Sequence, residues 1–297
     1  MTRTQQTCLI LTLGAVFLGG WFGVCRSLGW HARLAENNYQ ANLIRLETFL
    51  HQPAPPAVLV GSSMTGRLLP EYFADTSLAG VANLGLDGSI PDLGLDLVLS
   101  RKDPPAQVLV EVNTLLVKTP GNDATLRQAL GSFSFRLAGW LPFLRAEYRP
   151  SSIIYSTLKL RQDRRFLPPS ITRAPLLGVP LEPVPELSEQ DRQATLADPI
   201  LVRHLARLRE LQVRGARVIF YQLPGRTEAL PPLTAEWAGE LHIPLIRLGR
   251  EMHQRGFTPD FTHGRHPAPP GAEWHLTSPS AAQASRVLAE VARTTKP

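Results

Sequence analysis

Two adjacent serines follow an apolar run near residue 60. The stretch AVLVGSSMTGRL, residues 57–68, ends its apolar part on Gly61 and continues with Ser62 and Ser63. A serine hydroxyl attacks an acyl carbon only when an imidazole removes its proton and a carboxylate orients that imidazole. A serine that merely completes a turn needs no such partners. A nucleophilic function therefore predicts a histidine and an acid in other parts of the chain.

A histidine in a suitable context lies far along the sequence. His275 stands in EWHLTSPSAAQASRVLAEVA, directly before a pattern typical of an amphipathic helix. Ser278 or Ser280 is the predicted N-cap of that helix. The turn NLGLDGS, residues 83–89, and Asn113 in VEVNT add a glycine-rich loop and a side-chain amide.

Five short apolar runs alternate with helical patterns and predict the fold. The runs lack strict alternation, which is typical of strands covered on both faces. The predicted strands are 57–61, 80–86, 107–113, 216–224 and 243–248. The predicted helices between and after them are 91–101, 190–213, 232–240 and 278–292, with another leading in near 34–50. This order predicts an α/β fold, a three-layer α/β/α sandwich with a roughly five-stranded parallel, flavodoxin-like sheet.

The expected sheet brings the polar residues together. Ligands of open parallel sheets bind beyond the carboxyl ends of the strands. Ser63 follows the first predicted strand, the turn 83–89 follows the second, and Asn113 follows the third. With His275 before the last helix, four segments are expected to meet at one rim.

These segments resemble the sequence blocks of the SGNH/GDSL hydrolase superfamily. The first block of that family reads Gly-Asp-Ser, and Gly61-Ser62-Ser63 is similar to the variant of relatives tied to polysaccharide or cell-envelope acylation. The resemblance implies that Ser63 is the nucleophile. It also implies that the amides of Ser63 and Gly88 bind the oxyanion, because 83–88 resembles the second block. Asn113 would be a third donor, although the glycine of its block is missing.

The last block does not identify the carboxylate that would orient the histidine. The family pattern Asp-x-x-His-Leu is matched by His275 and its following leucine, but Ala272 stands at the usual acid position. Glu273 resembles the Asp-x-His arrangement of alginate-acetylation relatives. Asp260, in PDFTHGRH, is the alternative.

The resemblance implies a serine esterase or acyltransferase. Its expected substrates are acyl esters, acetyl above all, of an exopolysaccharide such as cellulose, handled beside a membrane O-acyltransferase or polysaccharide synthase. No cofactor is expected, and no metal, because His263 and His266 lack a convincing third ligand. The alternatives are a catalytically degenerate scaffold of such a complex, and a lysophospholipase with the aromatic residues of 132–144 as a lid.

The N-terminal stretch predicts a membrane anchor. Residues 8–25 carry no charge over a length that just spans a bilayer, between Arg3 and Arg26. We interpret it as an uncleaved signal anchor; a cleaved signal peptide and a buried core helix are the competing interpretations. The expected location is the bacterial inner membrane, single-pass, with the main domain in the periplasm. The predicted domains are an anchor at 1–26, a connecting helix and linker at 27–56, and a hydrolase domain at 57–297 with an insertion at 114–190.

Charge and composition indicate which classes of binding partner to expect. The chain has a net charge of +6 and a sequence pI near 9.7, but its basic residues form no run. Nucleic acid is therefore not an expected partner. A weaker inference from the net positive charge is attraction to an anionic membrane surface. The aromatic stretch 132–144 is expected to be core rather than membrane contact.

Overall fold

The computed structural model describes most of the 297 residues as two compact units. The described residues are 1–115, 121–164, 188–225, 230–231, 233–263, 266–267 and 275–295. Unit 1 comprises Met1–His51 and Leu126–Gln162, and unit 2 comprises Gln52–Thr125 and Asp163–Pro297. The sequence predicts 126–162 as part of an insertion in the sheet domain, whereas these residues group with the N-terminal segment.

Unit 2 contains the five-stranded parallel sheet that the sequence predicts. The strand order is β2-β1-β3-β4-β5, and every neighbouring pair is parallel. This is the flavodoxin-like order, in which the chain reverses its direction of travel across the sheet next to β1. The strands are β1 (Ala57–Gly61), β2 (Ala82–Gly85), β3 (Gln107–Glu111), β4 (Arg217–Gln222) and β5 (Leu245–Arg247).

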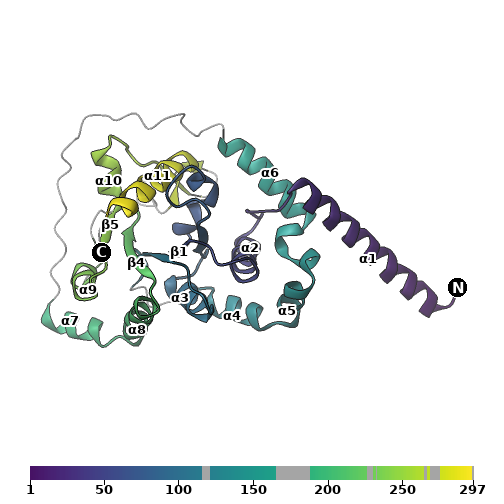
Figure 1. The fold of residues 1–297 in the computed structure, drawn as a ribbon, viewed down its shortest axis with the longest axis horizontal. Coiled ribbons are helices and arrows are strands. Elements are labelled where there is room, and N and C mark those ends of the chain that lie inside the picture. Colours follow the sequence, from purple (N-terminus) through teal and green to yellow (C-terminus); the bar gives the residue numbers. More distant parts are fainter. Residues whose placement is uncertain are drawn as a thin grey trace. The chain divides into compact units, whose positions relative to one another are not determined.

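Helices cover the sheet on both faces and complete the three layers. Helix α3 (Pro91–Ser100) packs on β1 and β2 and contacts α8 (Pro199–Val213). Helix α11 (Ser278–Thr294) contacts α10 (Leu248–Gln254) and β5. Figure 1 shows the strands between the α3 and α8 pair and the yellow α11. Burial on both faces explains why the strands consist of continuous apolar runs.

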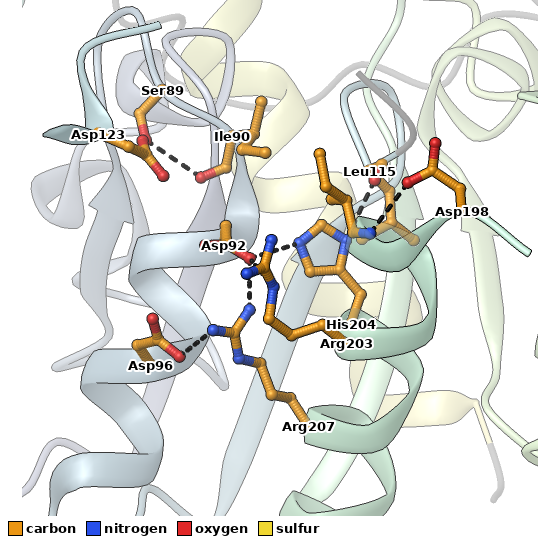
Figure 2. Close-up of polar contacts among 11 residues, drawn as sticks. Ser89, Ile90, Asp92, Asp96, Leu115, Asp123, Asp198, Arg203, His204 and Arg207 are labelled. Carbon is orange, nitrogen blue, oxygen red and sulfur yellow. Dashed lines mark hydrogen bonds and ion pairs between the residues drawn. The ribbon is translucent and has the colours of Figure 1, made fainter. Parts of the chain in front are cut away.

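A buried polar cluster fastens α3 to α8 (Figure 2). His204, fully buried, lies between Asp92 and the Leu115 carbonyl, with Nε2 3.2 Å from Asp92 Oδ1 and Nδ1 3.1 Å from the carbonyl oxygen. Arg207 pairs with both Asp92 and Asp96. Burial opposes ionisation of Asp92, but hydrogen bonds from His204 and Arg207 outweigh it and hold the pKa of this carboxyl well below its ordinary value.

Two helix boundaries differ from the prediction for local chemical reasons. The single helix predicted at 190–213 is two helices, α7 (Glu189–Leu196) and α8. Asp198 caps α8 by accepting a hydrogen bond from the Ile200 amide at 2.9 Å, and Pro199 occupies the first helical position. The N-cap of α11 is Thr277, rather than Ser278 or Ser280.

Shorter elements complete unit 2. A small antiparallel sheet of order β7-β6-β8 precedes α11. Its strands are β6 (Phe261–His263), β7 (His266–Pro267) and β8 (His275–Leu276). The remaining elements are η1 (Thr65–Arg67), η2 (Pro70–Phe73) and α9 (Thr234–Glu240).

Unit 1 contains the N-terminal helix and the aromatic stretch. Helix α1, drawn in purple in Figure 1, is long and apolar enough to cross a membrane. Helix α4 starts in unit 2 and continues into unit 1. The elements are α1 (Arg3–Leu28), α2 (Asn38–His51), α4 (Asp123–Gly131), α5 (Phe133–Trp140), η3 (Pro142–Leu144), η4 (Ala146–Tyr148) and α6 (Pro150–Arg164).

The expectation that 132–144 is core is correct for only part of this stretch. Phe135 and Ala138 are buried. Phe133 and Trp140 are 73% and 85% exposed, so these two large rings face outward.

Candidate active site

A serine and a histidine from distant parts of the chain form a hydrogen-bonded pair. Nε2 of His275 lies 2.9 Å from Oγ of Ser63. Both side chains are partly exposed, so another molecule can reach them. This distance is within the range that proton transfer from a hydroxyl to an imidazole requires. Of the residues predicted for the site, the structure brings these two into direct contact.

The two partners stand on segments fixed by backbone pairing. Ser63 is in the turn that leaves the carboxyl end of β1, and that turn closes with a hydrogen bond from the Gly66 amide to the Ser62 carbonyl. His275 begins β8, opposite Thr262 of β6 in the small antiparallel sheet. The N-cap of α11, Thr277, comes two residues later and anchors the strand to the final helix.

A buried carboxylate explains why the first serine follows the strand. Glu111, at the end of β3, is fully buried. It accepts hydrogen bonds from the Ser62 amide at 2.8 Å and from the Ser62 hydroxyl at 2.9 Å. The Met64 amide donates to the Ser62 hydroxyl oxygen at 3.2 Å. Ser62 is therefore a structural residue that shapes the turn and leaves Ser63 to face outward.

The same carboxylate also holds the far side of the turn. Thr65 donates to Glu111 through its hydroxyl at 2.5 Å and through its amide at 3.3 Å. Tyr221 of β4 completes the network, with its hydroxyl 2.6 Å from the Thr65 hydroxyl. Burial, together with the negative charge of Glu111, raises the pKa of Tyr221 well above its ordinary value, so it remains a neutral donor. The turn is thus hydrogen-bonded by Glu111 of the neighbouring strand β3 and by Tyr221 of β4, the next strand beyond it.

Gly61 is required where this network crosses the strand end. A Cβ atom at this position would lie 2.2 Å from Thr65 Oγ1 and 2.4 Å from Glu111 Oε2. Neither atom is free to move, because each is held by other hydrogen bonds of the network.

Sequence reasoning missed Glu111, Thr65 and Tyr221. The available signal was the single acidic residue within the apolar run 107–112, because a carboxylate in a strand covered on both faces needs several donors. The identity of those donors depends on which strands are neighbours, and the run itself does not contain that information.

The loop that carries Gly88 lies next to the serine turn. The Leu86 amide donates to the Gly61 carbonyl at 3.0 Å, so the chain leaves β2 beside the end of β1. Gly88 has a φ of +70°, which favours glycine. Its carbonyl accepts from the Asn122 amide at 2.7 Å, and the next residue, Ser89, donates to Asp123. Figure 2 shows Ser89 and Asp123 together. The start of α4 therefore supports the predicted oxyanion loop.

Asn113 lies on the other side of β1 but is already engaged. Its Nδ2 donates to the Leu223 carbonyl at 3.0 Å, and its Oδ1 accepts from the Leu223 amide at 2.8 Å. The carboxamide therefore joins the ends of β3 and β4. One hydrogen of Nδ2 makes no hydrogen bond within the described part of the chain, so a donor for an oxyanion remains. Asn83 is buried and bonds the Thr65 and Leu68 carbonyls, which makes it a support of the serine turn.

The structure describes only one of the two candidate acids. Asp260 is exposed, and its carboxylate makes no hydrogen bond or ion pair with any described residue. Its backbone pairs instead with Ser280 and Thr277, which places it beyond His275 in the strand register. Glu273 lies outside the described residues, as do the side chains of His263 and His266.

The geometry is that of a serine–histidine pair above a parallel sheet, between two segments with hydrogen-bond donors. Such an arrangement can activate a hydroxyl for attack on an acyl carbon. No protein-family model, curated protein or solved structure matches the chain.

Proposed function

We propose that the chain is a membrane-anchored serine esterase or acyltransferase of the SGNH/GDSL type, with Ser63 as its nucleophile. The observation that carries the proposal is the 2.9 Å contact between Ser63 Oγ and His275 Nε2 at the carboxyl edge of the sheet. The flavodoxin-like strand order supports it, because ligands bind at this edge in open parallel sheets.

The reaction proceeds through an acyl-enzyme. Ser63 Oγ attacks the ester carbonyl carbon while His275 Nε2 takes the hydroxyl proton. The amides of Ser63 and Gly88, with the remaining hydrogen of Asn113 Nδ2, stabilise the negative oxygen, each by on the order of 3 kcal/mol. The carbon–oxygen bond of the ester then breaks, and the leaving alcohol takes the proton from His275. Water or a sugar hydroxyl resolves the acyl-enzyme by the reverse sequence of proton transfers.

The network around Glu111 supports a catalytic function of the turn. A buried carboxylate is costly unless several donors surround it, and here donors on Ser62, Thr65 and Thr114 all converge on it. This network fixes the backbone from which Ser63 projects. A mere strand-end turn can form with far fewer polar contacts.

The proposed substrate and partner rest on the resemblance alone, and the proposed location rests on the N-terminal helix. We propose acetyl esters of an exopolysaccharide such as cellulose as substrates, with a membrane O-acyltransferase or polysaccharide synthase as the partner. The proposed location is a single-pass anchor in the bacterial inner membrane, with unit 2 in the periplasm. Helix α1 supports the anchor by its length and composition.

Hydrolysis of p-nitrophenyl acetate by the purified chain tests the proposal. The wild type should release nitrophenol and react once with a serine-directed fluorophosphonate, and Ser63→Ala should lose both activities. Ser62→Ala is the matched control at the neighbouring serine, and it should retain labelling. If Ser63→Ala hydrolyses the ester as fast as the wild type, the chain is a scaffold with an SGNH-like fold and no esterase.

A further inference from the structure

The end of helix α1 is packed into unit 1. Trp21 Nε1 donates to the Tyr148 carbonyl at 2.7 Å. The ring of Phe22 meets the rings of Tyr148 and Phe143 edge to face, with centroids 4.8 Å and 6.5 Å apart. Cys25, one turn further along, is fully buried. The segment 142–148 therefore holds the last turns of α1 directly, without a spacer.

The length of α1 fixes the depth of that contact in a bilayer. The part of α1 from Arg3 to residue 20 measures about 27 Å at 1.5 Å per residue. The hydrocarbon core is about 30 Å thick. If α1 crosses a bilayer, Trp21 and Phe22 lie at its interface, where tryptophan is enriched. The part of unit 1 that contacts them lies at the level of the lipid headgroups.

Helix α5 presents an unusual exposed face at the same unit. Phe133, Arg136 and Trp140 are exposed and follow helical spacing, while Phe135 and Ala138 are buried on the opposite side. Trp140 is 85% exposed. Tryptophan is enriched at membrane–water interfaces, and the long side chain of a neighbouring arginine can reach the lipid headgroups from there.

Helix α6 also exposes apolar side chains beside an arginine, and these are aliphatic. Ile154 and Leu158 are 60% and 62% exposed, and Arg161 continues the same face one turn later. Ile153 and Ser156 point inward and are buried. We call the exposed residues of both helices the interfacial face: Phe133, Arg136, Trp140, Ile154, Leu158 and Arg161.

The charge of the chain is concentrated in unit 1. Its two segments contain ten Lys and Arg residues and three Asp and Glu residues. Its net charge is therefore +7, whereas the whole chain has +6, so unit 2 is close to neutral. Each basic residue near an anionic lipid surface contributes about 1 kcal/mol to binding.

We infer that unit 1 lies on the membrane surface and binds anionic phospholipid headgroups through its interfacial face. Two properties favour lipid over a soluble partner. The helices that carry the face, α5 and α6, flank the segment 142–148, which contacts Trp21 and Phe22 of a helix suited to span the bilayer. The face's combination of exposed aromatic, aliphatic and arginine side chains complements both the acyl boundary and the negative headgroups. The inference does not depend on the proposed esterase activity.

The test uses the full-length chain in lipid nanodiscs. Both cysteines lie in α1 and are replaced, Cys8→Ser and Cys25→Ala, and an environment-sensitive NBD fluorophore is attached at Thr157→Cys, an exposed position on the same side of α6. Nanodiscs contain phosphatidylcholine alone or mixed with phosphatidylglycerol. Quenching by nitroxide-labelled lipid reports contact with the bilayer, and quenching by iodide reports contact with water.

Lipid quenching should be at least about twofold stronger with phosphatidylglycerol than without it. The double variant Arg136→Glu, Arg161→Glu should lose this difference, whereas Arg136→Lys, Arg161→Lys should keep it. Equal lipid quenching in both nanodiscs, or full access to iodide in both, would overturn the inference. Protection from iodide by soluble alginate, without lipid quenching, would assign the face to an acidic polysaccharide instead. Hydrolysis of p-nitrophenyl acetate by the glutamate variant should match the wild type.

Discussion

The hydroxyl oxygen of Ser63 lies 2.9 Å from Nε2 of His275, although 212 positions separate the two residues in the chain. Ser63 follows the first strand of the parallel sheet, and His275 lies in β8, two residues before the N-cap of the last helix. A hydrogen bond between groups so far apart in sequence forms only when the sheet and α11 are in place. The contact is thus a property of the folded unit rather than of either local segment.

Loss of either partner should be equivalent to loss of both. We expect Ser63→Ala and His275→Ala each to lower the rate of p-nitrophenyl acetate hydrolysis on the order of 10³-fold or more, because the two groups act as one unit. The double variant should be no slower than Ser63→Ala alone. Initial rates of the three variants measure this. If the rate loss of the double variant equalled the product of the two single losses, the two residues would not cooperate in one proton transfer.

The two candidate acids should differ sharply. Asp260→Asn should leave the turnover rate within about twofold of the wild type, because surface changes without partners have small effects. Glu273→Gln should lower it by orders of magnitude if this carboxylate orients His275. Thermal melting of both variants controls for the fold. The reverse ranking would transfer the orienting function to Asp260.

Replacing the buried carboxylate of Glu111 should destabilise the serine turn. Glu111→Gln introduces an NH₂ group among donors on Ser62 and Thr65, so the free energy of unfolding should fall by about 2–4 kcal/mol. Tyr221→Phe removes only one hydrogen bond of the network and should cost about 1 kcal/mol. Urea denaturation compares the variants. If Glu111→Gln is as stable as the wild type, the carboxylate does not hold the turn.

The effect of Glu111→Gln on catalysis separates positioning from stability. At a temperature where the variant is fully folded, kcat should fall while KM for a short ester changes little, because the position of Ser63 is altered and the acyl-binding surface is not. Tyr221→Phe is the matched control. An unchanged kcat would limit Glu111 to a structural role.

A buried glutamate in unit 1 should make stability depend on pH. Burial raises the pKa of Glu47 from 4.5 to about 7, although the Ala146 amide donates to it at 2.7 Å. The folded state therefore binds more protons than the unfolded state between these pH values. Stability from this group is fully present below pH 4.5 and is lost as the pH rises to about 7.

Glu47→Gln isolates this effect, because its carbonyl oxygen can still accept from Ala146. The variant should match the wild type near pH 4.5 and exceed it at pH 8 by on the order of 3 kcal/mol. Thermal unfolding of both proteins across this pH range gives the difference. A difference that stays constant with pH would show that Glu47 has an ordinary affinity for protons in the folded protein.

The sequence predicts most of unit 2 because its elements are locally determined. All five strands are recognisable as apolar runs, and the split of the helix at 190–213 is visible in principle from Asp198 and Pro199, a capping residue followed by a helix starter. General rules for parallel sheets leave few strand orders possible, and the observed order is one of the common ones. These rules also bring Ser63 and His275 to one rim.

Contacts between distant segments could not be predicted in the same way. The packing of 126–162 with the N-terminal residues depends on partners such as Trp21 and Tyr148, which no local pattern connects. The function of Glu111 could not be predicted for the same reason, because its donors Ser62 and Thr65 come from the turn after β1 and Tyr221 comes from β4. Periodicity indicates that a side chain is buried, and it does not indicate against what.

Because Gly61 has no side chain, the residues at positions 61, 65 and 111 constrain one another during evolution. A methyl group there would overlap Thr65 Oγ1, Glu111 Oε2 and Glu111 Cβ, so alanine at 61 would require changes at both 65 and 111 and a shift of the β3 backbone. A lineage that replaces the glycine before the other two residues must therefore pass through a poorly folding intermediate. Among descendants of a common ancestor, a side chain at 61 should therefore occur only where Thr65 and Glu111 have also been replaced. The Gly-Ser-Ser motif is thus one part of a unit that also includes Thr65 of the same turn and Glu111 of β3.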